Sequence, residues 1–562
     1  MSERPTEPAG ESRRAHMIAA AVTIASIFVA AGGVTWWNAQ TQPVFAARPH
    51  SVLGFVAQNA TWPDYATQQH APRNAPIMRA AARGARAFGG SYAAQMLPQT
   101  ALLAVLIAVC AWIAARVAGP FAAGLAAIVC AVTPANLLAA LAFDDQLFNM
   151  TATAIVVALL VEATRTGRAW IALVAGGIGA IVWRFAFVPS NGVLALGCVA
   201  CACTGMFADL AVARRAGAAS ASTKARLARP WVVAMAAFVA ALAGGIALGE
   251  FARELPLDYY SREAINVPAA ASGAADTARG LALYAARMWR TDLGPVLCAA
   301  LVLGAIGLAR SGSPHRFGLL AWLVVPLVVL SAIPKKNAYY ILPALAAVPI
   351  VIGAGIAAWP RVLRILAGAA CVLGAGALSV AWFTGLVANE PLSGEWTRHF
   401  QEAPNFSPGP PQIGAAPEAK TARALVDDIR RARPDDCPRL VIVAPGNQTR
   451  HFMNALTWFV LDADPRIALA EIGHVRRVPF EDGAPLLVAF GRDEMTVPPI
   501  GELNEYALDQ SRGESPFGRS GAAQYLTGVL SSGAPREVAR TERYTLWSLG
   551  AAAVATCPSV VP

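Results

Sequence analysis

Long apolar runs separated by short polar segments occupy the first two thirds of the chain. A transmembrane helix needs about 20 mostly apolar residues. By this criterion the pattern predicts eleven membrane spans, at 17–37, 99–117, 120–141, 148–163, 169–188, 192–212, 231–249, 294–309, 317–333, 339–359 and 363–384. The first run is longer than the apolar core of a signal peptide and ends in Trp36-Trp37, an interface pair, which predicts a retained anchor.

The pattern changes after the last span. Residues 385–416 are rich in Pro, Gly and Ser, which is typical of a linker. The remainder alternates between helical spacing and short apolar runs typical of buried strands. We expect helices at 417–433 and 453–461 and strands at 440–444, 467–472, 486–490 and 544–549. The expected fold class is mainly α, a polytopic transmembrane helical bundle over 17–384 followed by a C-terminal α/β domain over 417–562.

The composition supports a membrane protein. Apolar residues make up 56% and charged residues only 14%, whereas soluble proteins have about 25% charged residues. The net charge of +10 is unevenly placed: residues 1–387 carry +14 (28 basic minus 14 acidic), and residues 388–562 carry −4 (17 minus 21). Because the positive charge lies in the apolar part, it indicates membrane topology and not nucleic-acid binding.

The basic residues predict the orientation. With the N-terminal tail, 1–16, in the cytoplasm, the inside segments hold fifteen Lys and Arg residues. The short outside loops hold only Lys335 and Lys336, apart from Arg184 at a helix end. The long segments 38–98 and 250–293 then face outside, as does the C-terminal domain. We therefore expect a multi-pass protein of a bacterial-type plasma (inner) membrane with an extracytoplasmic C-terminal domain.

Acidic residues on the predicted outside are candidate catalytic bases. Asp144-Asp145 lies in a tight turn before a helix, where one Asp is enough to cap the helix and the second favours a polar site. Asp64 is the only acid between Trp37 and Pro98. It is either a solvated loop residue or a base whose pKa is raised near lipid.

Lys335-Lys336, with Tyr339 and Tyr340 close behind, is the candidate anion site. The two lysines either extend to lipid headgroups or bind a phosphate at the membrane plane. Arg184 has the same two interpretations. Arg287 and Arg290 flank Trp289 in the second long outer segment and are weaker candidates for contact with a headgroup or a saccharide.

The cysteines indicate no metal site. Seven of the nine lie in predicted spans, where a small buried residue is the simplest interpretation, and Cys201-x-Cys203 does not have zinc-ligand spacing. The sequence indicates no cofactor; a divalent metal stays open but is not indicated.

Four stretches, taken in order, resemble the class C membrane glycosyltransferases, the family that includes bacterial protein O-mannosyltransferases and the aminoarabinose transferases of lipid A. They are His70-x-Pro72 with Pro76 and Phe88-Gly89, then Arg116–Gly119 with Gly124, then Asp144, and then Ile333–Pro343. The resemblance covers about residues 1–384. The chain departs from the family in having no acid between residues 38 and 63 and no Arg before Tyr after Lys336.

The resemblance implies an inverting transferase that moves a sugar from a polyprenyl-phosphate donor to a lipid, glycan or protein acceptor at the outer face of the membrane. It implies one set of residues at the donor phosphate (Lys335, Lys336, Tyr339, Tyr340 and Arg184), a base among Asp64, Asp144 and Asp145, and His70 near the acceptor or a headgroup. A transporter or lipid flippase is the alternative, but it would need polar residues at mid-span, and these are few. A simple membrane anchor would not need eleven spans.

We predict a disulfide between Cys437 and Cys557, the only cysteines in the predicted outside domain. Both would face an oxidising compartment, and each lies next to an expected strand. Closing a loop of about 120 residues stabilises the fold by at most ~4–5 kcal/mol in the chain-entropy model. Mass mapping without reduction should find the linked peptide; two free thiols would contradict both the bridge and the outside location.

Overall fold

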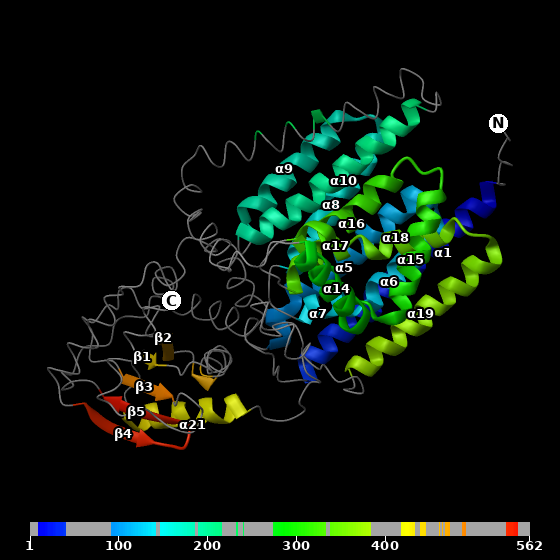
Figure 1. Cartoon of the computed structure of the whole chain (residues 1–562). Coiled ribbons are helices and arrows are strands. Elements are labelled where there is room, and N and C mark those ends of the chain that lie inside the picture. The colour runs from blue at the N-terminus through cyan, green and yellow to red at the C-terminus, as the bar shows by residue number, and fades with distance from the viewer. Residues whose placement is uncertain are drawn as a thin grey trace. The chain divides into compact units, whose positions relative to one another are not determined.

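The computed structural model describes residues 9–40, 92–141, 146–185, 189–215, 274–332, 338–383, 417–432, 439–444, 467–471, 486–490 and 535–548, together with residues 232, 233, 236, 240, 460, 463 and 464 (Figure 1). The chain divides into two compact units. One contains Met1–Gln40 and Met96–Pro411, and the other contains Thr41–Gln95 and Gln412–Pro562. The predicted span 231–249, the linker 385–416 and the helix 453–461 lie almost entirely outside the described residues.

Every described element of the first unit is helical. The elements are α1 (Ala9–Gln40), α5 (Tyr92–Ala118), α6 (Pro120–Val132), α7 (Pro134–Leu141), α8 (Gln146–Thr166), α9 (Ala169–Phe185), α10 (Pro189–Arg215), α14 (Ala274–Arg287), the π-helix η2 (Met288–Asp292), α15 (Gly294–Arg310), α16 (Arg316–Ala332), the 3-10 helix η3 (Ala338–Ile341), α17 (Leu342–Leu345), α18 (Val348–Ala357) and α19 (Arg361–Phe383).

Several of these helices have the length and composition of membrane spans. Four qualify by themselves: Arg13–Trp36, Met96–Ala118, Gln146–Thr166 and Arg361–Ala381. A fifth span results if Gly280–Arg290 and Gly294–Arg310, which meet at a bend of 115°, cross together. Shorter apolar helices are Pro120–Val132, Ala169–Gly179, Gly197–Asp209, Arg316–Ala332 and Leu342–Ala357. Each predicted span except 231–249 therefore contains a described helix, while the number of spans and the side of the N-terminus remain predictions.

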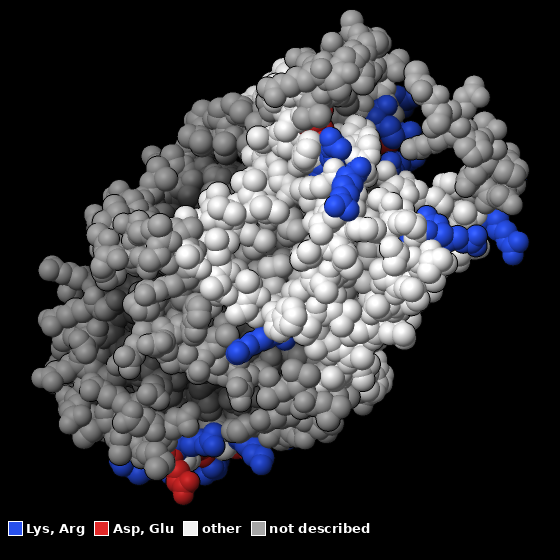
Figure 2. Space-filling view, turned by 45° about the vertical axis from the view of Figure 1, so that its right-hand side comes forward, with Lys and Arg blue, Asp and Glu red and all other residues white. Residues whose placement is uncertain are grey.

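Large apolar side chains are exposed on the outside of the helical unit. Phe28 and Val29 of α1 are 73% and 72% exposed, and Leu373 of α19 is 73% exposed. Figure 2 shows a broad stretch of described surface that carries no charged side chain. A soluble protein rarely exposes so large an apolar surface. Lipid is therefore the environment that this surface fits.

Contacts between helices show which ends lie together. The hydroxyl of Thr151 in α8 donates to the carbonyl of Leu102 in α5, and farther along the same two helices Arg116 pairs with Glu162 at 3.5 Å. The two helices therefore run in the same direction. Two spans that are separated by one other span should cross the membrane in the same direction, as α5 and α8 do.

Helices α6 and α19 also run in the same direction. Ser379 of α19 donates to the carbonyl of Val132 at the end of α6, while Arg364 lies over the ring of Phe121 at its start. Ala357, at the end of α18, packs with Ala114 and Ala122 near the turn between α5 and α6. Arginines from several helices therefore meet at one end of the unit, which we call the arginine end: Arg116, Arg165, Arg310, Arg316, Arg361 and Arg364.

Two predicted spans are broken in the structure. The span predicted at 120–141 forms α6 and α7, because Thr133 is extended (φ −68°, ψ 119°) and Pro134, which has no N–H, begins the next helix. The hydroxyl of Thr133 donates to Val129 O at 2.6 Å and closes the end of α6. The span predicted at 339–359 consists of η3, α17 and α18.

Glycines set the packing of α15 against α18. A Cβ atom on Gly355 would overlap the backbone of Gly304, and one on Gly307 would overlap the carbonyl of Gly355. Without side chains at these positions the two backbones approach closely, which is a common way for helices to pack in membranes. The indole N–H of Trp359 then donates to Leu303 O at 3.2 Å and joins α15 to the residue that follows α18.

We predict that Gly355→Ala destabilises the helical unit by about 1–3 kcal/mol, because the added methyl group forces two backbones apart. Gly376→Ala is the matched control, since a Cβ there meets nothing within 4 Å. Unfolding of both purified variants in detergent, followed by helical circular dichroism, should give a loss for the first and none for the second. Equal stability of the two variants would contradict the close contact.

The described part of the second unit contains a five-stranded mixed sheet and the helix α21 (Pro417–Ala432). The strands are β1 (Arg439–Ala444), β2 (Ile467–Glu471), β3 (Leu486–Phe490), β4 (Arg536–Arg540) and β5 (Tyr544–Ser548), and their order in the sheet is β2-β1-β3-β5-β4. β1 pairs in parallel with β2 and β3, with Val441 opposite Leu486. β5 pairs antiparallel with both β3 and β4.

Helix α21 is amphipathic. Its buried apolar residues, Ala422, Leu425, Val426 and Ile429, recur at the spacing of one helical face and are at most 2% exposed. The predicted helix 417–433 and the four predicted strands are present in the structure. Strand β4 was not predicted, because its sequence, REVAR, is charged at both ends as edge strands often are.

Candidate active site

The structure describes only part of the predicted site. Most of the predicted residues lie outside the described residues: Asp64, His70, Asp144, Asp145, Lys335, Lys336, Cys437 and Cys557. Arg184 belongs to α9 and Tyr339 to η3, but their side chains are not described. Tyr340, Arg287 and Arg290 are described in full. The structure describes the helices on either side of the two short candidate segments, 142–145 and 333–337.

The elements that flank these segments pack together. Asp145 directly precedes Gln146, the first residue of α8, while Lys335-Lys336 lies between the end of α16 and the start of η3. Helix α17, which follows η3, contacts both α8 and α16. The two candidate segments therefore connect to neighbouring helices of one bundle.

Helix α17 begins deep inside the unit. The indole N–H of Trp322 donates to Pro343 O at 3.1 Å, and Cys110 donates to Ala346 O at 3.6 Å. Trp322 lies ten residues before Ala332, a distance of about 15 Å along α16. The described part of the chain between Ala332 and α17 is a 3-10 helix, and the residues from Ile341 to Ile356 are all buried.

Uncharged polar side chains are buried where these helices begin or break. Gln146, Asn149 and Thr153 recur on one face of α8 and are at most 1% exposed. Asn136 is also fully buried, just after the break between α6 and α7, and its amide donates to Cys130 O at 2.9 Å. Among the described residues, the buried uncharged polar side chains at this end are Gln99, Thr100, Thr133, Asn136, Gln146, Asn149, Thr151, Thr153, Ser331 and Ser379. Because the arginines lie at the other end, we call this the polar end.

Charged residues of the second predicted outer loop form an ion pair. Arg287 Nε lies 3.1 Å from Asp292 Oδ2 across the π-helix η2, and the side chain of Asp292 is only 1% exposed. Gly294 then takes a positive φ of 77°, which allows the chain to turn sharply into α15. Arg287, expected to contact a headgroup or a saccharide, therefore holds this corner, whereas Arg290 is exposed. Asp292 was not singled out by the sequence because its partner is five residues away, outside ordinary helical spacing.

The described residues contain no group of three or more His, Cys, Asp or Glu side chains arranged to hold a metal ion. At the arginine end the carboxylates are paired with cations. Glu162 pairs with Arg165 at 2.7 Å, and Asp209 accepts the N–H groups of Phe317 and Gly318 at the start of α16. These acids stabilise helix ends and neighbouring arginines. The polar end is thus the better candidate for chemistry on a substrate.

Comparison with solved structures identifies the fold. No protein-family model and no curated protein sequence matches this chain. The crystal structure of ArnT from Cupriavidus metallidurans bound to undecaprenyl phosphate is similar, with a TM-score of 0.52 at 12% identity over 96% of this chain and 99% of that one. The apo structure of the same ArnT gives a TM-score of 0.50 at 14% identity over 94% and 98%. The chain has the fold of the class C membrane glycosyltransferases.

Proposed function

We propose that this protein is a glycosyltransferase that moves a sugar from a polyprenyl-phosphate donor to an acceptor of the cell envelope at the outer face of the plasma membrane. The observation that carries the proposal is the fold similarity, which spans nearly all of this chain and nearly all of an ArnT that binds undecaprenyl phosphate. The acceptor is a lipid, a glycan or a protein. We propose that the polar end of the bundle is the outer, catalytic end.

The path of the chain around Lys335-Lys336 supports a donor-phosphate site. Backbone that is not α-helical is found at membrane depth only where it is buried in protein or lines a water-filled cavity. The described residues between α16 and α17 form only a 3-10 helix that leads to a deep, buried α17. Lys335, Lys336 and the tyrosines of η3 would line the upper part of such a cavity, with Arg184 as a further cation. Two ammonium groups there would offset the charge of a phosphate.

The polar face of α8 supports recognition of a sugar. Gln146, Asn149 and Thr153 offer uncharged hydrogen-bonding groups, as hydroxyl groups require, and they follow Asp144-Asp145 directly in the chain. Few, well-placed polar groups in an apolar wall are typical of small-molecule sites. Buried polar side chains within membrane helices are expensive and therefore tend to be functional.

The proposed reaction is an inverting displacement. A carboxylate, of Asp64 or of the Asp144-Asp145 pair, takes the proton of the acceptor hydroxyl, whose oxygen attacks the anomeric carbon from the face opposite the phosphate. The bond between that carbon and the phosphate oxygen breaks, and the electron pair leaves with polyprenyl phosphate. Lys335 and Lys336 stabilise the charge that develops there, which is where stabilisation accelerates the step. The lipid tail stays in the membrane throughout.

Replacing either Lys335 or Lys336 with Ala should weaken binding of undecaprenyl phosphate about 10- to 150-fold, since one charge-assisted hydrogen bond contributes roughly 1.5–3 kcal/mol, and replacing both should weaken it further. Native mass spectrometry of the purified protein with added undecaprenyl phosphate measures this directly. Lys224→Ala is the matched control, because it removes the same charge from a predicted inside loop. If the variant that lacks both lysines binds undecaprenyl phosphate as the wild type does, Lys335 and Lys336 only contact lipid headgroups at the membrane interface.

One of Asp64→Asn and Asp144→Asn should abolish transfer, because Asn keeps the shape but cannot accept the proton. In a deletion strain, mass spectrometry of envelope lipids, glycans and proteins should show the loss of one glycosylated species. The wild-type gene should restore this species, and the gene of the inactive variant should not. The inactive variant should still bind undecaprenyl phosphate, since the base does not hold the donor. A transporter or flippase would instead tolerate both substitutions, and full restoration by both variants would refute the assigned bases.

A further inference from the structure

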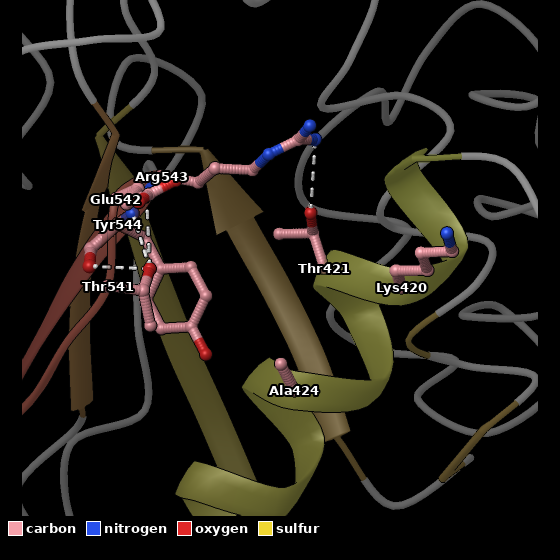
Figure 3. A pocket seen from close by; sticks show the side chains of 7 residues that line it. All are labelled: Lys420, Thr421, Ala424, Thr541, Glu542, Arg543 and Tyr544. Atoms are coloured by element: carbon pink, nitrogen blue, oxygen red, sulfur yellow. Dashed lines mark hydrogen bonds between the residues drawn. The ribbon is translucent and has the colours of Figure 1, made fainter.

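A cavity lies on the C-terminal unit, and none of its lining residues has been assigned a role above. Its volume is about 480 Å³, and it opens between the beginning of α21 and the turn that joins β4 to β5 (Figure 3). The lining residues are Lys420, Thr421, Ala424, Thr541, Glu542, Arg543 and Tyr544. Sites for small molecules span roughly 300–1,000 Å³. The cavity is thus larger than a bare inorganic anion needs.

The cations of this cavity differ from three other described arginines of the unit, each of which is paired with a carboxylate. Arg430 pairs with Asp464 at 3.2 Å, Arg431 pairs with Asp428, and Arg540 pairs with Glu537 at 2.8 Å. Within the described part of the unit, neither Lys420 nor Arg543 forms an ion pair. Among the described residues that line the cavity Glu542 is the one acid, so these residues together carry a net charge of +1.

The turn positions Arg543 over the start of α21. One guanidinium nitrogen of Arg543 donates to the Thr421 hydroxyl at 3.4 Å, as Figure 3 shows. Lys420 lies on the neighbouring position of the helix. Both cations therefore lie near the first turns of α21, where the helix dipole adds partial positive charge. A 16-residue helix is long enough for this contribution to matter.

The walls of the cavity are fixed before any ligand enters. Thr541 Oγ1 accepts the N–H groups of Arg543 at 3.2 Å and Tyr544 at 3.0 Å, which holds the turn in one conformation. The hydroxyl of Tyr544 donates to Asp428 Oδ2 at 2.8 Å, which fixes the aromatic ring against the helix. Burial, together with this hydrogen bond, raises the pKa of Tyr544, so the hydroxyl stays protonated. Tyr544 is only 1% exposed, whereas Ala424 is exposed and its small side chain leaves room for a ligand.

We propose that this cavity binds the anionic group of a ligand about the size of a monosaccharide, either a phosphate or a carboxylate, through Lys420 and Arg543. The phosphate or carboxylate accepts hydrogen bonds from the ammonium and guanidinium groups, and the rest of the ligand lies beside the exposed methyl group of Ala424. The site shares no residue with the proposed transferase site.

Lys420 is itself a clean reporter of occupancy. The chain has four lysines, and Lys420 is the only one after residue 387. Full-length protein in detergent is treated with acetyl-N-hydroxysuccinimide, and acetylation of Lys420 and of Lys224 is followed by peptide mass spectrometry. Glucose 1-phosphate, glucuronate and neutral glucose are the three added probes. Glucose 1-phosphate tests the phosphate source, glucuronate tests the carboxylate source, and glucose tests the anionic requirement.

At least one anionic probe should slow acetylation of Lys420 twofold or more at saturation, with no change at Lys224 and no effect of glucose. The protection should fall in high salt, because exposed ion pairs are screened. Arg543→Gln should raise the half-protecting concentration about 2- to 5-fold, Arg543→Lys should raise it less, and Arg536→Gln, which removes an exposed charge of β4 outside the cavity, should leave it unchanged.

Three results would overturn the site. One is acetylation of Lys420 that neither anion slows. Another is equal slowing at Lys224, which would mean that the probe consumes the reagent. The third is equal protection by glucose, which would mean that the charge of the ligand is not recognised. Circular dichroism of Arg543→Gln establishes that a loss of protection comes from a folded protein, and the Arg543→Lys variant gives the answer if Arg543→Gln does not fold.

Discussion

Inside a membrane the backbone has no water with which to form hydrogen bonds, so each N–H and carbonyl group must find its partner within the protein. The helices of the first unit satisfy this requirement along their length. Where a helix breaks, another group has to close the gap. The Thr133 hydroxyl does so at the end of α6, and the Leu293 N–H, which donates to Met288 O, does so after the π-helix.

Buried polar side chains of the helical unit lie next to these breaks. Asn136 follows one break, Gln146 begins the helix after a short connection, and Asp292 ends the π-helix with its own arginine partner. At the other end of the unit the arginines and their carboxylates are tied to helix termini. A substrate with a long apolar tail and a polar head requires the same division, with an apolar wall for the tail and a polar region for the head. The proposed lipid-linked donor fits that division.

Much of the helical unit could be predicted from the sequence, because a run of about 20 apolar residues is typical of a helix that spans the lipid bilayer. The breaks at Thr133 and after Ile341 were not predicted, since hydropathy averages over a window and does not register one extended residue. The spacing of Gln146, Asn149 and Thr153 is that of one helical face. This polar face of α8 was not predicted, because the residues around it are mostly apolar. Strand β4 and the Arg287–Asp292 pair depend on partners that only the folded chain brings close.

The glycine contact between α15 and α18 has a mechanical consequence. A slide of α18 by one helical turn would bring the branched side chain of Val351 to the position of Gly355, where the backbone of Gly304 leaves no room even for a Cβ atom. The hydrogen bond from Trp359 to Leu303 also joins the two helices, so we expect α15 and α18 to move together as one rigid unit. We therefore expect α15 and α18 to keep their spacing, so that a passage for the lipid tail of the proposed donor would open between other helices.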